Sequence, residues 1–223
     1  MAADGRDPRR RWVICHEKPP FTLSCSFGAI SDGWKTVKIA DHVGPPRISS
    51  GLDGIVIKRI QFPVPTTAED LLRRFEEAIT PRTRVLQLCH ITNVTGQLFP
   101  VRELSLLARQ RGIVTLVDGA QAIAHFSFAL RDLGCDVYGT GLHKWLMAPH
   151  GTGFLYVRRD QIERIWWLQG ALDSFRDDIR KFEEIGTQPA AARAAIADAL
   201  AFHQCRLRCT GRRGHCRPAA EKT

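Results

Sequence analysis

Apolar and polar positions follow a regular pattern only from Gly54 onward. From there, short apolar runs typical of strands alternate with stretches that place an apolar residue at every third or fourth position, as helices do. We expect strands at residues 55–57, 85–89, 113–117, 135–138 and 154–157. This alternation predicts an α/β fold: a mostly parallel sheet flanked by helices.

Three helices are expected among these strands. Thr66 and Glu69 have the spacing of a capping box, which predicts a helix start at that point. Pro100 suits the first turn of a second helix, and Gly112 suits its C-terminal end. An Ala-rich stretch at residues 190–203 predicts the third. The apolar stripe of the first helix consists of Leu71, Leu72, Phe75, Ala78 and Ile79.

The two ends of the chain differ from its middle. In residues 1–54, Pro and Gly are scattered and no period persists, so we predict no element there. Residues 55–204 are expected to form part of a ligand-binding domain. Residues 205–223 are rich in Arg, Cys and Gly and are expected to be disordered. Their cysteines and His215 do not have the spacing of a zinc site, so no metal is expected.

The positive charge of the chain lies mainly at its ends. The formal net charge is +9, of which residues 205–223 carry +5 and residues 1–12 carry +2. A nucleic-acid-binding domain is expected to spread such charge over a folded face. The basic end also lacks aromatic residues on which bases could stack. Nucleic-acid binding through this end is therefore a disfavoured alternative.

The apolar content indicates a protein of the cytoplasm. Hydrophobic residues make up 44% of the chain, and no run approaches the length that spans a membrane. The charged N-terminus lacks the apolar segment of a secretory signal. The seven cysteines therefore suggest no disulfide framework.

Three polar motifs each follow a predicted strand. They are HITNVTG at residues 90–96, DGAQ at 118–121 and GLHKW at 141–145. Ligands of parallel sheets bind beyond the carboxyl ends of the strands, so we expect an amide, a carboxylate and an amine to meet there. A pyridoxal phosphate site needs such a set, because the protein must supply an amine and tune the ring of the cofactor.

Each candidate residue also has a purely structural interpretation. Lys144 is the candidate amine, although most lysines are surface residues. Asp118 ends a buried strand, where it would pair with a protonated pyridine nitrogen or cap the next turn. Gln121 and Asn93 carry amides that suit the ring oxygen or an ordinary loop.

Three further side chains are weaker candidates. His90 closes a strand and is either a cofactor contact or a core histidine. His143 adjoins the lysine and would tune it or move protons near neutral pH. Thr140 offers a hydroxyl to a phosphate group.

Taken together, these motifs resemble the class V aminotransferase family of fold-type I pyridoxal phosphate enzymes. The resemblance covers residues 57–204 and includes GTGFLYV at 151–157 and EIGTQ at 184–188. It is strongest to the isopenicillin N epimerase-like branch, with cysteine desulfurases as relatives.

The resemblance implies a role for each candidate. Lys144 would be the Schiff-base lysine, Asp118 the partner of the ring nitrogen, and Asn93 and Gln121 the contacts of the ring oxygen. Thr187 would reach the phosphate of a neighbouring subunit, which implies a homodimer with a shared active site. Asp41-His42 resembles the segment whose histidine, here His42, stacks on the ring.

The chain also departs from the pattern of this family. Its members are longer and carry an upstream Gly/Thr phosphate-binding loop and an arginine for the substrate carboxylate, neither of which is recognisable here. Gly141 stands where relatives often place a polar phosphate contact.

The leading hypothesis is a pyridoxal phosphate-dependent enzyme that acts on an amino acid by transamination or epimerisation. It would thus be a transferase or an isomerase. A desulfurase is disfavoured because no cysteine stands in the matching context. The main alternative is a truncated, non-catalytic remnant of such an enzyme.

Overall fold

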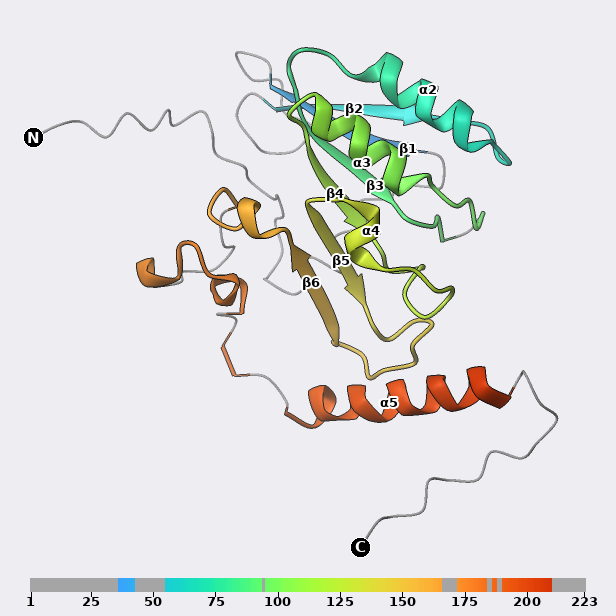
Figure 1. Cartoon of the computed structure of the whole chain (residues 1–223), viewed down its shortest axis with the longest axis vertical. Coiled ribbons are helices and arrows are strands. Elements are labelled where there is room, and N and C mark those ends of the chain that lie inside the picture. Colours follow the sequence, from blue (N-terminus) through green and yellow to red (C-terminus); the bar gives the residue numbers. More distant parts are fainter. Residues whose placement is uncertain are drawn as a thin grey trace, which may run out of the picture.

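The computed structural model describes residues 36–42, 55–93, 95–165, 172–183, 186, 187 and 190–209. Their six strands form one sheet in the order β2-β1-β3-β4-β5-β6 (Figure 1). The strands are β1 (Thr36–His42), β2 (Ile55–Gln61), β3 (Thr83–Cys89), β4 (Val114–Asp118), β5 (Val137–Gly141) and β6 (Gly153–Val157).

Most strands of this sheet run in one direction. β3, β4 and β5 pair in parallel, whereas β1 is antiparallel to both β2 and β3, so that β2 runs the same way as β3. β6 is antiparallel to β5. Four of the six strands thus point the same way, which confirms the expected α/β class with a mostly parallel sheet.

Two helices cover one face of the sheet. They are α2 (Ala68–Ala78) and α3 (Val101–Gln110), and the short α4 (Leu130–Leu133) follows before β5 (Figure 1). The expected capping box was placed one residue early. Thr67, not Thr66, is the N-cap of α2, and its side chain accepts a hydrogen bond of 3.1 Å from the Asp70 amide.

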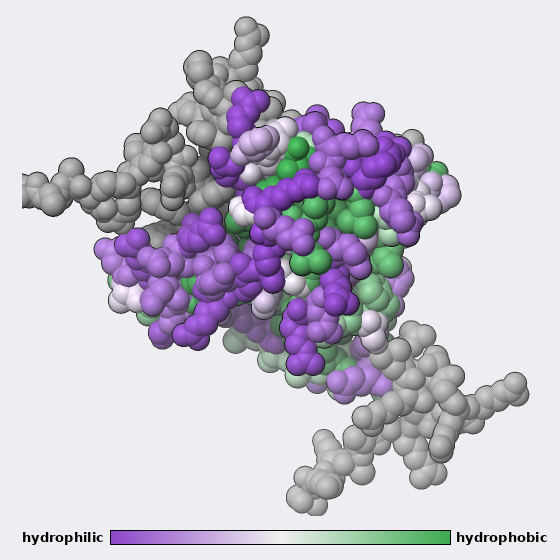
Figure 2. All heavy atoms as spheres, turned by 45° about the horizontal axis from the view of Figure 1, so that its top comes forward, coloured by the Kyte–Doolittle hydropathy of each residue, from purple (hydrophilic) through white to green (hydrophobic). Residues whose placement is uncertain are grey.

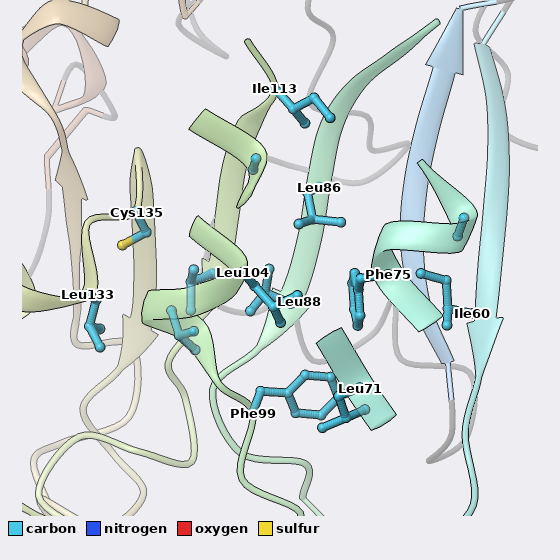
Figure 3. Packing of buried hydrophobic residues seen from close by; sticks show 14 of the residues in the cluster. Ile60, Leu71, Phe75, Leu86, Leu88, Phe99, Leu104, Ile113, Leu133 and Cys135 are labelled. Carbon is cyan, nitrogen blue, oxygen red and sulfur yellow. The ribbon is translucent and has the colours of Figure 1, made fainter. Parts of the chain in front are cut away.

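The core lies between these helices and β3. Leu86 and Leu88 of β3 project between Phe75 of α2 and Leu104 of α3, and all four are at most 1% exposed (Figure 3). Phe99 contacts Phe75 edge to face, with ring centroids 6.3 Å apart. Burying aliphatic and aromatic side chains of this size stabilises the fold by about 1.5–3 kcal/mol each.

The outer sides of the helices are hydrophilic. Arg73 forms ion pairs with Asp70 and Glu77, the i−3 and i+4 neighbours on α2, and Arg111 reaches Glu76. Figure 2 shows hydrophilic side chains over much of this side of the molecule, with apolar ones between them. Within the part of the chain that the structure describes, no helix is apolar and long enough to cross a membrane.

The chain after β6 forms short 3-10 turns and one long helix. The turns are η2 (Arg159–Gln161), η3 (Asp173–Phe175) and η4 (Ile179–Phe182). Lys181 of η4 is buried, and its ammonium group donates hydrogen bonds to the carbonyl oxygens of Ile162 and Arg176. Helix α5 (Ala190–Cys209) begins where predicted and continues six residues beyond the expected end at His203.

A buried polar network fixes the N-terminal ends of β4 and β5. One Asp136 carboxylate oxygen accepts hydrogen bonds from the amide (2.8 Å) and the hydroxyl (3.0 Å) of Thr115, and the other lies 2.9 Å from Arg158. The Asp136 amide in turn donates to the Thr115 hydroxyl at 2.8 Å. This network joins the parallel pair at the end opposite the three sequence motifs.

Replacing Asp136 with alanine is expected to destabilise the fold by about 2–4 kcal/mol, because the substitution leaves the buried Thr115 amide without its acceptor and removes one of the two carboxylates that pair with Arg158. Urea unfolding would measure the change. Asp132→Ala is the matched control, since Asp132 is exposed and its ion pair with Arg131 spans 3.6 Å. The control should change stability by less than about 0.5 kcal/mol. Equal effects of the two substitutions would contradict the prediction.

Candidate active site

The three sequence motifs meet at one edge of the sheet. β3, β4 and β5 are parallel and end at Cys89, Asp118 and Gly141, so the segments that follow them leave the sheet at the same edge. The His90 amide donates a 2.8 Å hydrogen bond to the Asp118 carbonyl, and the Gly119 amide donates to the Gly139 carbonyl at the same distance. The prediction that the motifs share this edge is confirmed.

Lys144 lies on the turn between β5 and β6. The Leu142 amide donates to the Thr152 carbonyl at the base of this turn, and the Ala148 amide donates to the Leu142 carbonyl. Leu142, Leu146 and Ala148 form a small apolar cluster that also includes Ile196 and Ala199 of α5. In Figure 1, α5 runs below the ends of β5 and β6. The turn that carries Lys144 is thus held by backbone hydrogen bonds at its base and by apolar contacts with α5.

Asp118 is the buried carboxylate of the site. Its side chain is 7% exposed, and one oxygen accepts a 2.9 Å hydrogen bond from the Ala120 amide. The other oxygen has no hydrogen-bond partner among the described residues. Burial raises the pKa of this carboxyl, while the Ala120 hydrogen bond and the positive charge of Lys144 act in the opposite direction. A carboxylate in this state favours a cationic N–H donor as an additional partner.

The charge of Lys144 also acts on Cys89. Burial raises the pKa of the Cys89 thiol to about 12, the Asp118 carboxylate adds to this rise, and Lys144 opposes it. The thiol therefore remains protonated at neutral pH and behaves as a small apolar group. Cys89 is the register partner of Asp118 in the parallel pair β3–β4, so the two residues lie side by side at the edge where the Lys144 turn follows β5.

Gln121 is held by two neighbouring side chains. Its side-chain oxygen accepts a 3.0 Å hydrogen bond from the indole nitrogen of Trp145, and its backbone carbonyl lies 3.1 Å from Nδ1 of His125. The rings of His125 and Trp145 stack, with centroids 4.3 Å apart and planes 19° apart. Gln121 therefore faces the turn that carries Lys144.

His90 has the surroundings of a core histidine. It is 3% exposed, Nδ1 lies 3.0 Å from the Tyr138 hydroxyl, and Phe126 and Phe128 contact its ring edge to face. Burial lowers the pKa of His90 to about 4, so the ring is neutral at physiological pH. The structure gives His90 a packing role beneath the site, and its contact with a cofactor stays a prediction.

Thr140 is fully buried in β5. Its hydroxyl donates to the carbonyl oxygens of Gly119 and Gly141, at 3.2 and 3.3 Å. These bonds connect β5 to the residue after Asp118. The hydroxyl is therefore occupied by the backbone, and this geometry does not favour the phosphate contact predicted for it.

His143 lies beside the Gly141 backbone. A methyl group built on Gly141 would come within 2.8 Å of the His143 ring carbon Cε1 and 3.1 Å of Nδ1. Nδ1 is buried and has no hydrogen-bond partner among the described residues. Burial lowers the pKa of His143, and the nearby His150 and Lys144 lower it further. The ring is thus neutral at pH 7 and available as an acceptor or donor.

The other predicted residues are less closely connected to this group. Asn93 lies in the exposed turn after β3, and Thr187 is exposed. The backbone of His42 lies in β1 opposite Ile55, and its side chain is outside the described residues. Glu184, Ile185 and Gln188 of the EIGTQ motif, and residues 1–35 and 210–223, are also outside them.

Three residues of the site were not predicted. Tyr138 packs against the backbone of Gly119, so a methyl group on Gly119 would overlap the tyrosine ring. Trp145 and His125 hold Gln121, as described above. Trp145 could have been noticed, since it directly follows Lys144. No motif in the sequence indicated Tyr138 or His125. Tyr138 contacts Gly119 on a different element, and His125 contacts Gln121 across a turn.

Comparison with known proteins gives the family. The model of the aminotransferase class-V family matches residues 54–209. Isopenicillin N epimerase of Amycolatopsis lactamdurans is 39% identical over 110 residues, which are 48% of this chain and 28% of the epimerase. A probable cysteine desulfurase of Vibrio cholerae is 34% identical over 157 residues, or 66% of this chain and 38% of that protein.

Solved structures agree with this assignment. The cysteine desulfurase CsdA of Escherichia coli is 32% identical, with a TM-score of 0.52 over 59% of this chain and 35% of CsdA. A variant of C-DES with glycine covalently linked to its pyridoxal phosphate cofactor is 25% identical, with a TM-score of 0.53 over 60% of this chain and 38% of C-DES. The chain thus spans less than two fifths of the length of each of these relatives. It belongs to the aminotransferase class-V family, whose members use the cofactor predicted from its sequence, pyridoxal 5'-phosphate.

Proposed function

We propose that this chain carries the cofactor-binding edge of a pyridoxal phosphate-dependent enzyme that acts on an amino acid. The observation that supports this proposal most directly is a buried carboxylate at the end of β4, next to the turn after β5 that carries a lysine. Asp118 is 7% exposed, and the charge of Lys144 acts on it across the ends of β4 and β5. A sheet edge with this pair offers an amine for a covalent bond and an anion for a ring nitrogen.

The residues present fit the cofactor. The Asp118 oxygen without a partner would accept a hydrogen bond from the protonated ring nitrogen, which relieves the cost of a buried charge. Lys144 would hold the cofactor covalently, and Gln121 and Asn93 would donate to its ring oxygen. When bound, pyridoxal phosphate serves as an electron sink for the α-carbon of an amino acid.

Lys144 and His143 would carry the proton transfers. Lys144, when its amine is not bonded to the cofactor, would remove or return a proton at the substrate α-carbon. His143, neutral at pH 7 and adjacent in sequence, would accept or relay that proton. Return of the proton to the opposite face of the α-carbon would give epimerisation, whereas in transamination the bound cofactor would supply the acceptor for the amino group. Both reactions are consistent with these groups.

The shared active site is a separate proposal. Thr187 would reach the phosphate site of a second copy of the chain, which requires a homodimer. The exposure of Thr187 supports this arrangement, because a residue that serves a neighbouring subunit must be accessible to it. A cross-subunit contact of this kind would also make cofactor affinity depend on protein concentration.

Borohydride labelling tests the cofactor site. The protein purified with pyridoxal phosphate is expected to be yellow, and reduction should fix one cofactor on the peptide that contains Lys144. Lys144→Ala is expected to abolish this label, because Lys144 is the one amine at this edge of the sheet among the residues that the structure describes. Absorption spectra and peptide mass mapping provide the measurement.

Lys58→Ala is the matched control. Lys58 is an exposed lysine of β2 whose ammonium group donates to the Ala78 carbonyl, and its removal should leave the label unchanged. Labelling that persists in Lys144→Ala, or a wild-type protein that takes up no cofactor, would refute the proposal. The second result would favour the non-catalytic alternative.

The reaction can then be resolved with a panel of amino acids. Inversion of configuration at the α-carbon with retained amine indicates epimerisation, whereas formation of a keto acid indicates transamination. Formation of alanine from cysteine, with the sulfur transferred to a thiol added to the assay, would instead indicate the activity named for several relatives. Cys89 does not supply a reactive thiolate for that activity, because burial keeps it protonated.

A further inference from the structure

Three side chains form a closed ring of contacts beside Lys144. Trp145 donates to the Gln121 side chain, His125 contacts the Gln121 backbone carbonyl, and the two aromatic rings stack on each other. We refer to Gln121, His125 and Trp145 as the amide clamp. The clamp joins the segment after β4 to the turn between β5 and β6.

The chemistry of the indole fixes the orientation of the Gln121 amide. An indole N–H is only a donor, so the atom 3.0 Å from it must be the carbonyl oxygen of the amide. The reversed amide would place two N–H donors against the indole N–H, which is repulsive. The NH2 group of Gln121 is consequently directed away from Trp145, and no other described residue accepts a hydrogen bond from it.

His125 supports the same orientation from the backbone side. Its Nδ1 lies 3.1 Å from the Gln121 carbonyl oxygen, which can only accept, so Nδ1 carries the proton. The ring then lies flat against Trp145, with 19° between the planes. Because offset stacking favours this arrangement, His125 limits the rotation of the indole that holds the amide.

We propose that Trp145 and His125 are positioning residues that hold the Gln121 NH2 group toward the cofactor ring oxygen. This inference rests on the proposed function. A donor at that oxygen stabilises its anionic form, whereas a freely rotating amide would present its own oxygen half of the time. Since Trp145 follows Lys144 directly, one turn fixes both the amine and the amide.

The first test uses the cofactor-free protein. The indole N–H signal of Trp145 is identified in a proton–nitrogen spectrum by its loss in Trp145→Phe. Gln121→Leu, which keeps the size of the side chain but removes its oxygen, should shift this signal upfield. Leu106→Ala, an exposed substitution on α3, is the matched control and should leave the signal in place. A signal unchanged by Gln121→Leu would overturn the clamp.

The second test uses the cofactor-loaded protein. The pH midpoint of its visible absorption band should rise by roughly half to one unit in Trp145→Phe, because the ring oxygen loses an oriented donor. Gln121→Leu should raise it at least as much, and the double variant should show no further rise, since both changes remove the same interaction. A general loosening of the fold would not produce this non-additive spectral shift.

The outcomes separate this inference from the proposed function. If Lys144 is labelled by borohydride but Trp145→Phe leaves the midpoint unchanged, the positioning role is wrong and the cofactor site stands. Additive shifts in the double variant would also refute it, because Trp145 would then act independently of Gln121. A wild-type protein that takes up no cofactor would defeat both.

Discussion

Asp118→Asn is expected to make the cofactor-free protein more stable while it removes most of the activity. The substitution keeps the acceptor for the Ala120 amide but removes a charge that burial disfavours. The free energy of unfolding at pH 7 should rise by about 1–2 kcal/mol, the typical cost of an incompletely compensated buried polar group. The loss of attraction to Lys144 reduces this gain but does not reverse it, since burial is the larger effect on the pKa of Asp118.

The dependence on pH has a definite sign. The pKa of the Asp118 carboxyl is higher in the folded chain than its ordinary value of 3.8, so the unfavourable charge is fully present at neutral pH. As the pH falls through the raised pKa, the wild-type carboxyl becomes protonated, and the advantage of Asp118→Asn should shrink. Urea unfolding of both proteins across the acidic range measures this difference. A constant difference, or a less stable variant at pH 7, would contradict the prediction.

Activity should change in the opposite direction. Without an anion at the ring nitrogen, removal of the substrate α-proton is expected to slow by about 10²- to 10³-fold, as when a preorganised electrostatic contact is lost. Exchange of the α-proton with deuterated solvent measures this rate for any amino acid that the wild-type protein accepts. Asp132→Asn, an exposed control, should match the wild type in both experiments.

Gly119→Ala is expected to destabilise the fold by about 3 kcal/mol or more, at the upper end of overpacking effects. The added methyl group would overlap the ring of Tyr138, which is fully buried and hydrogen-bonded to His90. For a domain of this size, thermal unfolding should begin about 6–12 °C lower. Circular dichroism on heating provides the measurement.

A second substitution distinguishes this clash from a general intolerance of alanine. Tyr138→Val removes the ring, so the double variant should be more stable than the sum of the two single effects indicates. At Gly112 a methyl group meets no atom within 4 Å, and the positive φ of 68° alone should cost about 1 kcal/mol in Gly112→Ala. Additive effects at positions 119 and 138 would refute the proposed overlap.

The elements with a strong hydrophobic period could be predicted from the sequence. β3, β4, β6 and the first two helices appear within a few residues of the expected positions, because each buries one continuous apolar face. β1 was missed because only Val37 and Ile39 alternate with polar neighbours, and its pairing with β2 and β3 is not a local property. The N-cap was placed at Thr66 instead of Thr67, because the sequence does not distinguish the threonine that accepts from the Asp70 amide from the one that donates to the Asp70 carboxylate.

The location of the site could be predicted more readily than its contacts. Parallel strands bring their carboxyl ends together, so the neighbourhood of Asp118 and Lys144 follows from topology. Whether a side chain is free depends on neighbours that are distant in sequence. Thr140 bonds to Gly119, 21 residues away, and Gln121 bonds to Trp145, 24 residues away. No pattern along the chain specifies such pairs.

Substitutions at Gly141 and His143 depend on each other, because the two positions compete for the same space. The His143 ring fills the space that a side chain at position 141 would need, so no larger residue fits at 141 until the ring moves. A hydroxyl residue suited to a phosphate group would therefore be accommodated at position 141 only together with a shift of the His143 ring. Replacing His143 by a smaller residue would remove the need for this shift, so positions 141 and 143 should be varied together.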